Sequence, residues 1–174
     1  MGQGSIIGYE INEKTCQISY YSEEQMEPQT LEVDEDNFQI PLIIGRLRDT
    51  WAYGKEAKRL ATVKEGFTVT RLLNRSLAGE KIEFGEETYD AVWLLSKFIQ
   101  MSLHDFPEIE GIVFTVPALT EELAQMADAS VLVVRQDTVL TKDINDAIDI
   151  LNNTRGKVLG CVLNDASSSQ ITGS

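Results

Sequence analysis

Alternating apolar and polar positions open the chain. Residues 5–11 and 16–21 both alternate, and the polar run Asn12-Glu13-Lys14 lies between them. Successive side chains of a strand point to opposite faces of a sheet, so this pattern predicts two strands joined as a hairpin. Further short strands are predicted at residues 30–33, 38–45 and 51–54. The first third of the chain is therefore predicted to be antiparallel β-structure.

Helical spacing takes over in the middle of the chain. Helices are predicted at residues 55–62, 68–78 and 88–106, with a small strand at 81–84. The last of these helices has apolar residues every three or four positions, which places them on one buried face. They are Ala91, Leu94, Leu95, Phe98 and Ile99. Thr88 is predicted to cap this helix and Pro107 to end it.

The last third alternates strands with helices. Residues 111–116, 130–135 and 157–163 are continuous apolar runs, typical of buried strands. Helices are predicted between them, at 121–127 and 141–154, and such a series connects parallel strands. The small, polar residues 166–174 are predicted to be a disordered tail. The predicted fold class is α/β, with antiparallel hairpins first, parallel strand–helix–strand units after them, and helices packed on the sheet.

Charge and composition limit the function classes. With 28 acidic and 15 basic residues the net charge is −13, which opposes binding to nucleic acid or to an anionic membrane. No apolar run reaches the length of a membrane span, and the first residues lack the basic region of a signal peptide. Cys16 and Cys161 lie in apolar runs and are predicted to be two buried thiols of a cytoplasmic protein.

A collinear series of short segments gives a first resemblance. The segments are IIGYEINEKTCQISYY, IPLIIGR, WAYGKEAKR, TRLLNR and, after the long predicted helix, GIVFTVPA. In this order, residues 6–118 resemble the N-terminal half of the actin-like and heat-shock-chaperone ATPase domain. The resemblance implies a ribonuclease H/actin-like sheet, with ATP and Mg²⁺ as cofactors. It also implies that a further half is needed to complete a nucleotide cleft.

In that family the first hairpin wraps the phosphates with backbone N–H groups, and an acidic residue of the first strand helps to hold the hydrated metal. The resemblance implies that Glu10 takes the acidic, metal-holding position and that Asn12 and Thr15 belong to the phosphate loop. It implies that Arg71 supplies a positive charge. The sequence departs from the family pattern because the loop has no glycine and Thr70 replaces the expected lysine. An altered ATP site and a purely structural hairpin both remain open.

A second resemblance covers residues 119–165. The stretch ADASVLVVRQDTVLTKDINDAIDILNNTRGKVLGCVLND resembles the C-terminal end of the bacterial tyrosine kinases of capsular-polysaccharide assembly, which belong to the Min/ParA-like P-loop class. It implies that Asn164 reads the adenine edge; a turn residue at the end of a strand is the alternative. The chain has no GxxxxGK[ST] motif and no tyrosine in its tail, so kinase activity is not expected.

Together the resemblances predict a composite chain, with residues 1–118 and 119–165 packed on one sheet. The two segments are joined in a natural protein, by an artificial recombination or by an error of the gene model. Three functions follow: an actin/chaperone-type ATP-binding protein with weak or lost hydrolysis, a non-catalytic kinase-like module of polysaccharide assembly, or a scaffold without a ligand. The third needs no cofactor, and catalysis is not the favoured expectation for any of them. The expected partner is another protein or a second copy.

Three further groups of residues receive structural interpretations. Lys55, Lys58 and Arg59 are interpreted as a solvated helix face, with contact to phosphate as the alternative. Trp51 and Trp93 are predicted to lie in the core, because no basic neighbours indicate a stacking platform for bases. The single histidine, His104, suits the C-terminal end of a helix.

Overall fold

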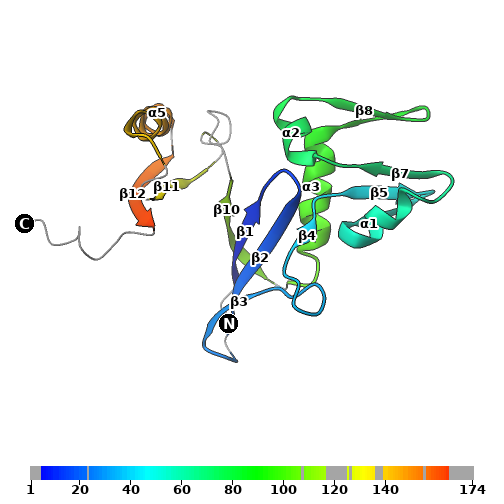
Figure 1. The fold of residues 1–174 in the computed structure, drawn as a ribbon, viewed down its shortest axis with the longest axis horizontal. Helices are drawn as coiled ribbons and strands as arrows, with labels where there is room; N and C mark the ends of the chain where they lie inside the picture. Colours follow the sequence, from blue (N-terminus) through cyan, green and yellow to red (C-terminus); the bar gives the residue numbers. More distant parts are fainter. Residues whose placement is uncertain are drawn as a thin grey trace, which may run out of the picture. The chain divides into compact units, whose positions relative to one another are not determined.

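The computed structural model describes residues 5–22, 24–106, 108–116, 125, 127–135, 139–154 and 156–164. They belong to two compact units, Met1–Pro117 and Ala118–Ser174, which are described separately (Figure 1). The predicted α/β class, with both antiparallel and parallel strands, is confirmed. The predicted tail at 166–174 and most of the predicted helix at 121–127 lie outside the described residues. No helix in the described part is long and apolar enough to cross a membrane.

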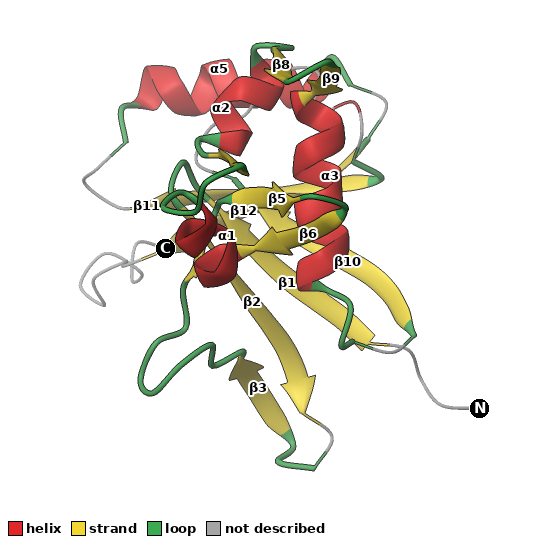
Figure 2. Ribbon diagram, turned by 90° about the vertical axis from the view of Figure 1, so that its right-hand side faces the viewer, coloured by secondary structure: helices red, strands yellow, loops and turns green. Residues whose placement is uncertain are grey.

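The first sheet of unit 1 is built around the predicted hairpin. Strands β1 (Ser5–Ile11), β2 (Thr15–Ser22) and β3 (Glu27–Thr30) run antiparallel, and the short β4 (Ile40–Pro41) pairs with the start of β2 (Figure 2). Strand β10 (Ile109–Thr115) pairs with the other edge of β1 and runs parallel to it. The sheet order β10-β1-β2-β3 therefore brings together segments about a hundred residues apart.

Helix α3 (Ala91–Ser102) shares one hydrophobic core with this hairpin. Alternate residues of β1 and β2 are fully buried with Leu94 and Phe98 of the helix, as the two periodicities predict. Thr88 does not cap α3, because it lies in β9 (Glu87–Asp90). The cap is Asp90, whose carboxylate accepts a 2.8 Å hydrogen bond from the Val92 N–H. The helix ends at Ser102, so the prediction that Pro107 ends it is also wrong.

A second sheet has the order β6-β5-β7 and is antiparallel throughout. It consists of β5 (Ile44–Leu47), β6 (Thr50–Tyr53) and β7 (Gly66–Val69), with α1 (Gly54–Leu60) between β6 and β7. Helix α2 (Leu72–Leu77) and strand β8 (Lys81–Phe84), which pairs with β9, follow.

Three further predicted elements of unit 1 have different boundaries in the structure. The helix predicted at 68–78 begins only at Leu72, because residues 66–69 alternate in burial and pair with β5. The strand predicted at 38–45 is divided into β4 and β5. The strand predicted at 30–33 lies earlier, as β3, where it pairs with β2.

Unit 2 contains β11 (Ala129–Arg135), α5 (Thr141–Asn152) and β12 (Lys157–Asn164). The two strands pair in parallel, as the strand–helix–strand pattern predicts. Val134 and Leu151 are buried, but β12 is exposed along its whole length and β11 along most of it. Strand β10 of unit 1 is also largely exposed, so the prediction of three buried strands is wrong. Cys161 of β12 is likewise exposed, so only Cys16 fits the prediction of buried thiols. That β11 and β12 continue the sheet of unit 1 stays a prediction.

Candidate functional site

The turn of the β1–β2 hairpin is closed by the side chain of Asn12. Its Oδ1 accepts hydrogen bonds from the backbone N–H groups of Lys14 and Thr15, both at 2.9 Å. The Asn12 N–H donates to the Thr15 carbonyl oxygen at 3.0 Å, and the Thr15 hydroxyl lies 3.1 Å from Asn12 Nδ2. An asparagine that bonds the backbone two and three residues ahead stabilises a tight turn without glycine.

Neighbouring elements hold the same turn from outside. Glu13 Oε1 accepts a 3.0 Å hydrogen bond from Asn74 Nδ2 of α2, and the Lys14 carbonyl oxygen accepts one of 2.8 Å from the Leu42 N–H. A phosphate cradle needs several backbone N–H groups that converge on one point in solvent. In this turn two such groups already point at Asn12. The geometry of the turn therefore does not fit a bound phosphate.

The remaining predicted site residues are spread over three elements. Glu10 is exposed on β1, opposite Gln17 of β2 and Thr115 of β10. Arg71 precedes α2 in a left-handed conformation, with φ 57°. Asn164 ends β12, in the other unit. The structure thus brings Glu10, Asn12 and Thr15 together on one hairpin and places Arg71 at the start of a neighbouring helix.

A different part of unit 1 forms a cavity, beside the second sheet. One face of that sheet carries small residues. A Cβ atom on Gly66 would lie 2.3 Å from the Leu60 carbonyl oxygen, and one on Gly45 would lie 2.8 Å from the Phe67 carbonyl oxygen. Glycine at these positions lets α1 and the following turn lie close against the strands.

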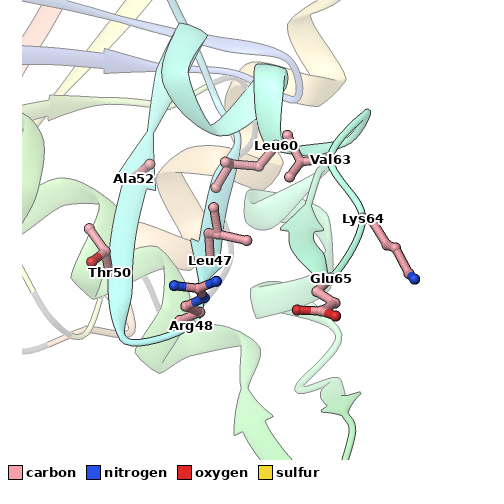
Figure 3. A pocket seen from close by; sticks show the side chains of 8 residues that line it. All are labelled: Leu47, Arg48, Thr50, Ala52, Leu60, Val63, Lys64 and Glu65. Carbon is pink, nitrogen blue, oxygen red and sulfur yellow. The ribbon is translucent and has the colours of Figure 1, made fainter.

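The cavity opens where α1 ends, and its volume is about 590 Å³. The cavity is lined by both apolar and polar residues. The apolar residues are Leu47, Ala52, Leu60 and Val63, and the polar residues are Arg48, Thr50, Lys64 and Glu65. Figure 3 shows Leu47, Leu60 and Val63 grouped together, with Arg48 and Glu65 beside them and Lys64 extending outward. The cavity is open to solvent on one side, and its lining combines an apolar patch with a few charged groups.

Arg46 fixes the β5–β6 turn that carries Arg48. Its Nε donates to the Arg48 carbonyl oxygen, and its Nη1 donates to the Glu87 carboxylate and the Tyr89 hydroxyl. Hydrogen bonds from Tyr89 and Arg46 hold the pKa of Glu87 below its usual value. The Arg46 guanidinium also lies 5.7 Å from the centre of the Trp51 ring. The turn at the cavity is therefore anchored from the opposite face of the sheet.

That opposite face is aromatic. The Trp51 ring lies 5.4 Å from Tyr89 and 5.6 Å from Trp93, in edge-on arrangements that aromatic pairs favour. Trp93 is 46% exposed, so the prediction that it lies in the core is wrong. It occupies the first turn of α3, where Val92 is exposed as well.

A polar network within the core has no access to solvent. The Tyr9 hydroxyl lies 2.8 Å from Ser102 Oγ and donates to Cys16 Sγ at 3.4 Å. Burial raises the pKa of Cys16 to about 11 and also raises the pKa of Tyr9. Because all three residues are buried, the network ties α3 to the hairpin and is not a binding site.

The cavity was not predicted from the sequence, although the segment that lines most of it differs from the rest of the chain in charge. Residues 46–64 contain six basic residues and only two acidic ones, in a chain whose net charge is −13. The basic group of Lys55, Lys58 and Arg59 belongs to this segment. Arg48 and Lys64 lie in turns before and after α1, and only the paired strands bring those turns to one cavity.

A family model matches most of the chain. Its description is "Family of unknown function (DUF5716) C-terminal", and it matches residues 27–141. The chain belongs to the DUF5716 family. The region shared with that family includes β3, the whole second sheet, α3 and β10, and it extends past the boundary at Pro117 into unit 2. The cavity therefore lies within the family region. No curated protein matches the chain.

Proposed function

We propose that the chain is a protein of the actin/chaperone ATPase fold that has lost ATP hydrolysis and acts by binding a protein partner. The closed turn at Asn12 carries this proposal. Its side chain accepts from the N–H groups of Lys14 and Thr15, the groups that a phosphate would need. Because the N–H groups of this turn are bonded within the hairpin, the hairpin has a structural role. The function then depends on other surfaces of the protein.

Two observations support the fold part of the proposal. Strand β10, which carries the GIVFT stretch of the resemblance, pairs in parallel with β1, and the inserted second sheet lies between them in sequence. The family match crosses residue 118, which supports a natural protein containing both resembling segments. We place this protein in the cytoplasm, on its composition and its buried Cys16 thiol.

The surfaces available for a partner lie on both sides of the second sheet. The cavity at Arg48 lies on one face, and on the other face the exposed Trp93 of α3 packs against Trp51. Aromatic residues and arginine are enriched among the residues that dominate protein–protein binding.

A thermal melt of the full chain tests the proposal, with millimolar Mg-ATP and with Mg-GTP as the control. A ligand at about 100 times its Kd stabilises a protein by ~2.7 kcal/mol, which moves the melting temperature measurably. We expect no shift with either nucleotide. An ATP-specific shift that Glu10→Ala removes would overturn the proposal in favour of a working phosphate loop. A shift removed by Asn164→Ala but not by Glu10→Ala would favour the kinase-like module.

A further inference from the structure

We propose that the cavity between the β5–β6 turn and residues 61–65 binds an acidic peptide segment that inserts one large apolar side chain. This inference rests on the proposed partner-binding function and names the chemistry of the partner.

The interior of the cavity fits an apolar side chain. Leu47, Leu60 and Val63 supply its apolar surface, and Ala52 leaves room because its side chain is small (Figure 3). The volume of about 590 Å³ is within the range of natural ligand pockets. An apolar group that enters removes its own surface and that of the cavity from water.

The charged residues that line the cavity are net positive, although the protein as a whole is negative. Residues 46–64 contain six basic and two acidic residues, but Arg46 lies on the opposite face of the sheet with Glu87, and Lys55 pairs with Asp34. At the cavity itself, Arg48 and Lys64 outnumber Glu65. A negatively charged ligand is repelled by most of this protein and attracted here, which favours acidic residues beside the inserted side chain.

The turn that carries Arg48 is held in place before any ligand binds. The Arg46 side chain bonds the Arg48 carbonyl oxygen, and its guanidinium is fixed by Glu87 and Tyr89. At the other side, Gly66 lies so close to the Leu60 carbonyl oxygen that an added Cβ atom would be 2.3 Å from it. A preformed site loses less conformational entropy when it binds.

The position of the cavity favours an extended peptide over a membrane surface. Strand β6 is one of the two outer strands in the sheet order β6-β5-β7, and its Thr50 and Ala52 line the cavity. An extended segment along an outer strand can place alternate side chains into a neighbouring pocket. A net charge of −13 opposes approach to an anionic lipid surface.

Fluorescence anisotropy tests the inference on the full chain at low salt. The probe is a labelled nine-residue peptide with one phenylalanine at its centre and aspartate and glutamate around it. We expect saturable binding that weakens about tenfold in the double variant Arg48→Asn, Lys64→Gln, because it removes the cation beside the apolar lining and the outward-pointing cation at the rim. Asparagine suits the left-handed conformation of Arg48, whose φ is 54°. Lys81→Gln, on the exposed start of β8, is the matched control and should leave binding unchanged.

Two further probes complete the test. A peptide with glycine in place of the phenylalanine should bind about tenfold more weakly than the parent peptide if the apolar cavity is used. Equal binding of both peptides, or equal binding by the double variant and the Lys81 control, would overturn the inference. So would binding to phosphatidylglycerol vesicles, lost in the double variant, without binding to the peptide. If the peptide fails to bind and the nucleotide melts stay flat, this inference fails while the proposed loss of nucleotide chemistry stands.

Discussion

The β1–β2 and β5–β6 hairpins of unit 1 have the same kind of alternation but use their polar groups differently. In β1–β2 the turn is closed by Asn12, which accepts from the two N–H groups that follow it. In β5–β6 the turn is held by Arg46 from one face, and Arg48 lines a cavity on the other. The first hairpin therefore uses its turn chemistry for its own stability, and the second leaves charged groups available to a ligand.

The strands of the two hairpins also differ in burial and in the size of their side chains. Ile7, Tyr9 and Ile18 of the first hairpin are fully buried in the core. The second sheet has glycine and alanine on its cavity face, at Gly45, Ala52 and Gly66, so α1 fits closely and a cavity remains beyond its end. A hairpin whose side chains form the core is poorly suited to a contact that forms and breaks with a binding partner. A hairpin at the surface is better suited to such a contact.

The largest effect is expected from the core of the first hairpin. Ile18→Ala should lower the free energy of unfolding by about 2–5 kcal/mol, because it removes a fully buried side chain and leaves a void. Ile6→Ala, whose side chain is 63% exposed on the neighbouring strand, should cost no more than about 0.5 kcal/mol. Urea unfolding measures both. Equal losses in the two variants would contradict the assigned burial.

The inner face of the first hairpin should also make stability depend on pH. Burial raises the pKa of Cys16 from 9.0 to about 11, so the unfolded chain ionises first as the pH rises. The folded state is therefore fully stabilised below pH 9 and loses roughly 2–3 kcal/mol between pH 9 and 11. Tyr9 acts in the same direction.

Denaturant unfolding at a series of pH values measures this loss. Cys16→Ala removes the thiol and should flatten the curve between pH 9 and 11 by the Cys16 contribution. An unchanged slope in this variant would show that the thiol does not ionise differently in the two states.

Close packing under the cavity gives the next largest effect. Gly66→Ala should destabilise the chain by about 1–3 kcal/mol, because the added Cβ would lie 2.3 Å from the Leu60 carbonyl oxygen and force a shift. Gly111→Ala, on β10, meets nothing within 4 Å and serves as the control. Thermal melts of the two variants compare them. The contact is not as close as described if both melt like the parent chain.

The smallest effect concerns the closed turn. Asn12→Ala should cost about 1 kcal/mol, because it removes the acceptor for the N–H groups of Lys14 and Thr15. Asn12→Asp keeps an acceptor oxygen in the position of Oδ1 and should restore most of that loss. Urea unfolding of the three proteins is the measurement. A loss that is the same in the Asp and Ala variants would mean that the acceptor does not stabilise the turn.

Short-range periodicity predicted much of this fold. The first hairpin, the core face of α3 and the parallel pairing of β11 with β12 follow from patterns within a few residues. The wrong predictions concern segments whose conformation depends on the strand that pairs with them. Residues 66–69 become a strand because β5 lies beside them, and Asp90 rather than Thr88 caps α3 because β9 continues to that residue.

The site was harder to predict for a related reason. The resemblance singled out Glu10, Asn12 and Thr15, but sequence alone could not say that Asn12 would occupy the N–H groups of the turn. Arg48 and Lys64 are separated by α1 and meet at one cavity only through the sheet. The excess of basic residues from 46 to 64 was readable in the sequence; the cavity beside it was not.

Backbone NMR of the ¹⁵N-labelled chain tests the central claim most directly, because it shows which hairpin meets a ligand. The spectrum is recorded alone, with Mg-ATP, and with the acidic phenylalanine peptide. The account predicts that the peptide shifts the amide signals of residues 47–65 and that Mg-ATP leaves those of residues 10–15 unchanged. Saturable shifts at residues 10–15 with Mg-ATP, and none at 47–65 with the peptide, would contradict it.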